Sequence, residues 1–195
     1  MISLGVLGSG KGSNFSALLE AMRSGVLSAR AVLVLSDNAG AGILRLAEEE
    51  GIPHGVICEP KYRTRLSRDV EAEAVSRLRA AGADLIVLAG YMRMVKEPFL
   101  EAYPQRMVNI HPSLLPKYPG LAAWRQALDA GETEAGCTVH LVDEGMDTGE
   151  ILAQERVPIL PDDTAESLHA RIQEVEHRLL PQVVAGLCRK LAPAR

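Results

Sequence analysis

The stretch ISLGVLGSGKGSN, residues 2–14, decides the fold expected for this chain. Residues 2–7 are mostly apolar, which is typical of a buried strand. Three closely spaced glycines follow, and glycine lets a backbone turn tightly and approach a ligand. Ser13 and Asn14 then open a helical segment, whose free N–H groups attract an anion. The stretch therefore predicts the start of an α/β unit that binds a phosphate.

The glycine loop fits neither of the two common phosphate-loop patterns. A dinucleotide fingerprint places its third glycine one residue later than Gly12, and a Walker A loop needs Ser or Thr at that position. A single terminal phosphate is the best interpretation, with a plain glycine turn as the alternative. Asp37 ends the second expected strand and could imitate the ribose-binding acid of a dinucleotide site.

Apolar runs alternate with helical segments along residues 1–110. We expect strands at 2–7, 31–35, 55–58, 84–89 and 106–110, and helices at 14–24, 43–50, 66–80 and 96–103. Strands that are apolar on both faces and separated by helices predict a mostly parallel sheet covered on both sides. Residues 1–110 are therefore expected to form a doubly wound, Rossmann-like, nucleotide-binding half. Such sheets bind ligands beyond the carboxyl ends of their strands.

The pattern changes in the second half, residues 111–195, which we assign to the same single domain. Residues 112–120 are rich in proline and irregular. A helix is expected at 122–130 and strands at 137–142 and 151–160, with Pro158 marking an edge strand. A long C-terminal helix spans 163–191, and Asp163 and Glu166 stand at capping-box spacing at its start.

Composition limits the partners. The chain has 195 residues, a net charge of −4 and 4% aromatic residues, so nucleic acid is disfavoured as a partner. Cys58, Cys137 and Cys188 are scattered, which indicates free thiols in a reducing compartment. No run reaches membrane-spanning length and the N-terminus has no signal-like segment. We expect a cytoplasmic protein that meets no membrane.

Asn109 and His111 are candidate catalytic residues. In an extended segment they point to the same side, with Ile110 turned away. An amide donor and an imidazole suit an oxyanion or a proton transfer, whereas a histidine that caps backbone groups is the alternative. Asp147 lies in a glycine-flanked loop, and a carboxylate beside His111 is expected to raise the histidine pKa. An ordinary turn aspartate is the alternative for Asp147.

Two other pairs are less specific. Cys137 and His140 resemble half of a zinc site, but no second pair has suitable spacing, so we interpret them as strand residues and expect no metal. Gln173 and Glu176 share one face of the last helix and could simply be solvated.

Four stretches together carry a resemblance. GSGKGSN, LAGYMRM, NIHPSLLPKYPG and VDEGMDTGEI stand at residues 8–14, 88–94, 109–120 and 142–151. In this order they resemble the glycinamide ribonucleotide formyltransferases, purine-biosynthesis enzymes of the formyltransferase fold that use 10-formyltetrahydrofolate. The resemblance runs from residue 2 to about 191. It departs at Tyr91, where Phe is frequent, and in the basic segment 61–68.

The resemblance implies a role for each matching residue. Asn109 and His111 would stabilise the oxyanion formed when the ribonucleotide amine attacks the formyl carbon, and Asp147 would keep His111 protonated and help to move a proton. The ribonucleotide would be held by Gly12, Ser13, Asn14, Gln173 and Glu176. The folate would be held by Arg65, Met92, Arg93, Met94, Val95, Asn109, Val142, Asp143 and Asp147. It implies small-molecule substrates only, and a monomer or homodimer.

Several alternative functions remain for this sequence. Methionyl-tRNA formyltransferase and formyltetrahydrofolate hydrolase normally carry a further domain, which we do not expect in this chain. A non-catalytic nucleotide sensor would need the glycine loop but not Asn109, His111 and Asp147 together. A nicotinamide dehydrogenase is disfavoured by the glycine spacing.

Overall fold

A computed structural model describes residues 1–57, 59 and 61–192. Its seven strands form one sheet in the order β3-β2-β1-β4-β5-β6-β7. The first five run parallel, and β6 and β7 are antiparallel to their neighbours. The strands are β1 (Ile2–Leu7), β2 (Ala29–Ser36), β3 (His54–Val56), β4 (Leu85–Leu88), β5 (Met107–His111), β6 (Glu134–Leu141) and β7 (Ile151–Pro158).

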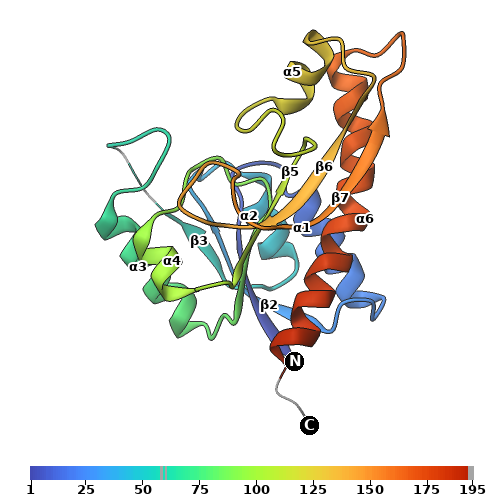
Figure 1. The fold of residues 1–195 in the computed structure, drawn as a ribbon. Coiled ribbons are helices and arrows are strands. Elements are labelled where there is room, and N and C mark those ends of the chain that lie inside the picture. Colours follow the sequence, from blue (N-terminus) through green and yellow to red (C-terminus); the bar gives the residue numbers. More distant parts are fainter. Residues whose placement is uncertain (58, 60, 193–195) are drawn as a thin grey trace.

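Helices cover both faces of the sheet (Figure 1). Helices α3 and α4 lie on one side, and the long C-terminal helix α6 runs along the other, beside α1. The helices are α1 (Ser13–Arg23), α2 (Gly42–Glu49), α3 (Arg68–Ala80), α4 (Glu97–Ala102), α5 (Ala123–Asp129) and α6 (Ala165–Leu191). The predicted doubly wound, mostly parallel fold with a long C-terminal helix is therefore confirmed.

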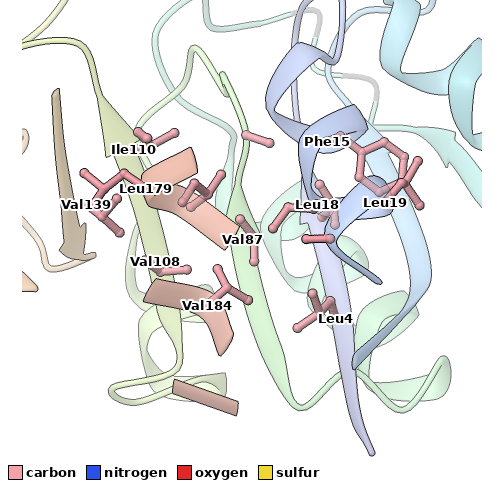
Figure 2. Close-up of a cluster of buried hydrophobic side chains, with 14 of the residues drawn as sticks. Leu4, Phe15, Leu18, Leu19, Val87, Val108, Ile110, Val139, Leu179 and Val184 are labelled. Carbon is pink, nitrogen blue, oxygen red and sulfur yellow. The ribbon is translucent and has the colours of Figure 1, made fainter. Parts of the chain in front are cut away.

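Alternating side chains of the central strands supply two cores. In β4, Leu85 and Val87 enter the core beneath α1 and α6, whereas Ile86 and Leu88 enter the core beneath α3 and α4. Figure 2 shows the first core, in which Val87 lies between side chains of α1 and α6. Burial on both faces explains why this strand is apolar throughout instead of alternating with polar residues.

The strand order reverses at β1, which leads to β2 on one side and lies beside β4 on the other. Open α/β sheets bind ligands at such a point, beyond the carboxyl ends of the strands. Here the glycine loop after β1 contacts the loop after β4, because the Ser9 N–H donates to the Gly90 carbonyl over 3.0 Å. The fold therefore gathers the candidate site residues of several strands at one edge.

Most expected elements are present with bounds shifted by a few residues, and β7 with Pro158 is an edge strand as predicted. The predicted third strand reaches Cys58, which lies outside the described residues. Within residues 1–57, 59 and 61–192, no helix combines the length and hydropathy that spanning a membrane would need.

The expected capping box of the last helix is wrong. Thr164 is the N-cap, and its hydroxyl accepts from the Ser167 N–H at 3.1 Å while the Ser167 hydroxyl accepts from the Thr164 N–H at 3.0 Å. Asp163 instead accepts two hydrogen bonds from the Arg171 guanidinium, at 2.6 and 2.8 Å. Arg171 lies nearly two turns inside α6, and its guanidinium binds the carboxylate that the sequence predicts as part of the cap.

Replacing Thr164 tests this cap. We expect Thr164→Ala to lower the free energy of unfolding by about 1 kcal/mol, because the first turn of α6 loses a side-chain acceptor. Urea unfolding measures the change, with Thr164→Ser as the matched control that keeps the hydroxyl. Equal losses in the two variants would contradict the assigned cap.

Candidate active site

Strand β5 delivers Asn109 and His111 to the site. Ile110 packs into the core beneath α6, so its two neighbours project from the opposite face, as the extended spacing predicts. Strand β6 lies antiparallel beside β5, and its His140 stands opposite Asn109 in the register. His111 is almost fully buried, and Asn109 is half-buried.

The Asp147 carboxylate joins these side chains. Its Oδ2 lies 3.3 Å from Nδ1 of His111 and accepts from the Gly120 N–H at 2.8 Å. Its Oδ1 accepts from Asn109 Nδ2 at 3.4 Å and lies 3.6 Å from Nε2 of His140. Asp147 has a left-handed backbone with φ 56°, a conformation that costs free energy and that functional sites often retain.

His111 is held from both sides of its ring. Nε2 lies 2.9 Å from the Tyr118 carbonyl, which can only accept, so this nitrogen carries a proton. Nδ1 faces Asp147. Burial lowers the pKa of His111 below its ordinary value, although the Asp147 carboxylate and the Tyr118 carbonyl raise it in part. The expectation of a raised histidine pKa is therefore wrong, because desolvation of the ring outweighs the nearby carboxylate.

Asp147 itself remains ionised. Burial raises its pKa, but the His140 ring when protonated, the Gly120 N–H and the charge of a protonated His111 outweigh burial and hold the pKa of Asp147 below its ordinary value. An ionised carboxylate next to a neutral imidazole can stabilise a proton that reaches the ring during a reaction.

His140 belongs to the site although the sequence did not single it out for catalysis. Its Nδ1 lies 2.7 Å from the Leu141 carbonyl and so carries a proton, which leaves Nε2 to accept from Asn109 Nδ2 at 3.1 Å. Cys137 packs into the core on the opposite face of β6, so these two residues cannot bind one metal together. Only the register of β6 against β5 identifies His140 as a neighbour of Asn109, and this register cannot be read from the sequence.

The glycine loop and α6 form a second part of the site. Gly12 has φ 88°, and a Cβ there would lie 2.9 Å from the Ile43 backbone, so both conformation and space require glycine. Ser13 begins α1 immediately after it. Asn14 Nδ2 donates to the Glu176 carboxyl at 3.1 Å, while Asn14 Oδ1 is buried without a partner among the described residues.

Glu176 lies almost fully buried on α6, and half-buried Gln173 lies nearly one turn before it. Burial raises the pKa of Glu176 to about 7, although the Asn14 hydrogen bond lowers it in part. The structure thus brings together residues from opposite ends of the chain that the sequence assigned to one ligand.

Apart from Asn109 on β5, the expected folate residues lie on three neighbouring segments: the one with Arg65, the one after β4 and the loop after β6. Arg65 pairs with Met94, and the Met94 N–H donates to the Thr64 carbonyl at 2.9 Å. Lys96 Nζ donates to the Glu144 carbonyl at 3.0 Å, which ties the segment after β4 to the loop that carries Val142, Asp143 and Asp147. Asp143 shapes that loop by accepting from Gly145 N–H and the Thr148 hydroxyl.

Not every expected folate residue offers its side chain. Val95 is buried in the core beneath α3 and α4, and the Arg93 guanidinium binds Asp37 and two backbone carbonyls. Met92 and Met146 are about half exposed, at 56% and 49%. These methionines are the apolar side chains that a flat ring could cover.

The comparisons with known proteins identify the family. The family described as "Formyl transferase" matches residues 3–184. A Bacillus subtilis protein named "Phosphoribosylglycinamide formyltransferase" is 40% identical over 187 residues, covering 96% of this chain and 95% of that one. The chain belongs to the formyl transferase family.

Solved formyl transferase structures agree. A glycinamide ribonucleotide transformylase 1 from Symbiobacterium toebii has a TM-score of 0.92 at 44% identity, covering 97% of this chain and 89% of that one. A phosphoribosylglycinamide formyltransferase from Bacillus halodurans has a TM-score of 0.91 at 41% identity and covers 97% of both chains.

A longer formyl transferase relative matches only in part. The "Trifunctional purine biosynthetic protein adenosine-3" of Drosophila melanogaster is 50% identical over 184 residues, which are 93% of this chain but 14% of that protein. The chain therefore spans about a seventh of the length of that relative.

The buried carboxyl of this formyl transferase predicts a pH-dependent stability. The folded pKa of Glu176, about 7, lies above the value of 4.5 for a free side chain, so its contribution is complete below the lower value and is lost as pH rises through 7. We expect Glu176→Gln to gain unfolding free energy relative to the wild type between about pH 5 and about pH 8.

Urea unfolding across that pH range checks this expectation, with exposed Glu174→Gln on the same helix as the matched control. A difference between wild type and Glu176→Gln that does not change with pH would show that Glu176 does not titrate in this range.

Proposed function

We propose that this chain transfers the formyl group of 10-formyltetrahydrofolate to the amine of glycinamide ribonucleotide. The products are N-formylglycinamide ribonucleotide and tetrahydrofolate, in de novo purine biosynthesis. The observation that carries the proposal is the Asp147 carboxylate in contact with Asn109, His111 and His140. The names of the Bacillus relatives support the choice of substrate.

Glycinamide ribonucleotide binds along the glycine loop and α6 in this proposal. Its phosphate accepts from backbone N–H groups at the start of α1, at Gly12, Ser13 and Asn14, where the helix dipole favours an anion. Gln173 and Glu176 face its glycinamide part. The buried Asn14 Oδ1 has no partner in the part of the chain that the structure describes, which supports a ligand that donates a hydrogen bond at this point.

The residues on the other side of Asp147 fit a folate. Half-exposed Met92 and Met146 offer apolar surface to a flat ring system. The segment after β4 and the loop 142–147 offer backbone donors and acceptors, and Arg65 offers a cation to a folate carboxylate. When bound, 10-formyltetrahydrofolate supplies the formyl group, whose carbon bonds to the ribonucleotide amine as its bond to the folate nitrogen breaks.

Asn109 donates a hydrogen bond to the formyl oxygen in this mechanism. Its Nδ2 makes one short contact with His140 and one longer contact of 3.4 Å with Asp147. The longer contact is the one that a ligand oxygen replaces, while His140 keeps the amide oriented. A preorganised donor at an oxygen that gains negative charge lowers the barrier of acyl transfer.

His111 and Asp147 move the proton. Because Nε2 of His111 donates to the Tyr118 carbonyl, the neutral ring keeps a free lone pair on Nδ1. A proton released by the attacking amine is taken up there, directly or through water, and the ionised Asp147 stabilises the resulting imidazolium. The proton then passes to the departing folate nitrogen.

The reaction needs small-molecule substrates only, and we place it in the cytoplasm, with the protein a monomer or homodimer. Among the described residues, no group of three or more His, Cys, Asp or Glu side chains is placed to hold a metal ion. The second candidate function is hydrolysis of 10-formyltetrahydrofolate, which the same Asn109, His111 and Asp147 would serve with water as the nucleophile.

Turnover of the purified protein separates these functions. We expect tetrahydrofolate to form from 10-formyltetrahydrofolate only when glycinamide ribonucleotide is present, as followed by absorbance. Equal product without the ribonucleotide would mean a hydrolase. Binding of the ribonucleotide without any product would indicate a sensor and contradict the proposal.

Truncating the oxyanion donor tests the mechanism. We expect Asn109→Ala to lower kcat on the order of 10²–10³-fold, because it removes a hydrogen bond that strengthens in the transition state. Exposed Asn38→Ala, in the loop after β2, serves as a comparison for loss of an amide elsewhere at this edge. An effect of Asn109→Ala on KM alone would point to ground-state binding instead.

A further inference from the structure

Ser9 links the loop after β1 to the loop after β4. Its backbone N–H donates to the Gly90 carbonyl at 3.0 Å, and its hydroxyl oxygen accepts from the Met92 N–H at 2.9 Å. The same hydroxyl donates to Oδ1 of Asp37, at the end of β2, over 2.5 Å. One serine thus fixes the start of the glycine loop against the segment assigned to folate.

Asp37 extends this link to Arg93. Its second oxygen, Oδ2, accepts from Arg93 Nε at 2.6 Å, and both side chains are only 11% exposed. Both carboxylate oxygens are therefore engaged by the protein. This arrangement removes the alternative that Asp37 acts as a ribose-binding acid in the free protein.

Arg93 completes a continuous path. Its Nη1 donates to the Tyr62 carbonyl and, at 3.1 Å, to the Arg65 carbonyl. The segment that carries Arg65 is thereby held against the segment that carries Met94, with which Arg65 pairs. Ser9, Asp37 and Arg93 connect the phosphate side of the site to residues 62–65 and 92–95 of the folate side.

Charge supports this path more strongly than neutral hydrogen bonds would. Hydrogen bonds between a guanidinium and a carboxylate are short and directional, and removing one partner leaves the other charge buried and unpaired. The pair joins the loops after β2 and β4, and the Ser9 hydroxyl joins the loop after β1 to both of them. A ligand that orders one loop therefore lowers the cost of ordering the others, which is a coupling free energy between two binding sites.

We propose that Asp37 and Arg93 are positioning residues that couple ribonucleotide binding at the glycine loop to folate binding at residues 62–65 and 92–95. The inference rests on the proposed function for the identity of the two ligands. Ribonucleotide binding then raises the affinity for folate, and folate raises the affinity for the ribonucleotide by the same factor.

The test is the affinity for a folate analogue without a transferable formyl group, measured by calorimetry with and without glycinamide ribonucleotide. In the wild type we expect the ribonucleotide to tighten analogue binding by about fivefold or more. In Asp37→Asn we expect this ratio to fall toward one, by about twofold or more. The folate KM should rise accordingly, while kcat at saturating substrates changes little.

Two further variants keep the test decisive. Ser9→Ala removes only the hydroxyl link, and we expect it to lower the same ratio. It replaces Asp37→Asn in the test if that variant is too unstable to study. Asp163→Asn is the matched control, because it breaks another carboxylate–guanidinium pair, with Arg171, on the connection between β7 and α6. It should lower stability without changing the ratio.

A wild-type ratio near one, or an unchanged ratio in both Asp37→Asn and Ser9→Ala, would overturn the coupling. A ratio that falls equally in Asp163→Asn would overturn the assignment to this path. Failure of the proposed function is seen in turnover and not in this ratio: the wild type would form tetrahydrofolate equally without the ribonucleotide, or would bind the ligands and form none.

Discussion

The contact of the Asp147 carboxylate with two imidazoles and one amide is the interaction on which the site depends. An ionised carboxylate that is largely removed from water is costly unless donors surround it. Here the Gly120 N–H and Asn109 Nδ2 donate to it, and His111 and His140 lie beside it. The carboxylate therefore keeps its charge, and that charge fixes where a proton is stabilised.

The fold brings this carboxylate and its neighbours together from four separate segments, one of which carries Asp147 itself. Parallel strands bring β5 to the ligand edge, and antiparallel pairing sets His140 opposite Asn109. Two loops with left-handed residues close the site, one with Tyr118 and one with Asp147. Each left-handed residue costs conformational free energy, which packing of the surrounding structure must offset. The sheet therefore positions the side chains of Asn109, His111 and His140. The two loops supply the Tyr118 carbonyl and the Asp147 carboxylate, which contact the two ring nitrogens of His111.

Much of this arrangement follows from local sequence patterns. The buried strands and the helices between them predict the doubly wound sheet, and the extended spacing of Asn109 and His111 predicts their common side. The features that could not be predicted depend on distant contacts. His140 lies in the site because of the register between β5 and β6. Asp163 binds the Arg171 guanidinium, and the N-cap of α6 is Thr164. The lowered pKa of His111 depends on its depth of burial, which a neighbouring carboxylate in the sequence does not give.

The role of the Asp147 charge is tested most directly by kcat of Asp147→Asn for formyl transfer to glycinamide ribonucleotide. Asparagine tolerates a left-handed backbone and keeps the shape of the side chain while it removes the charge. We expect a large fall in kcat with an unchanged unfolding midpoint, and little change in kcat for Glu144→Gln, which removes an exposed charge from the same loop. Near-normal turnover of Asp147→Asn would contradict a role for this charge in the reaction.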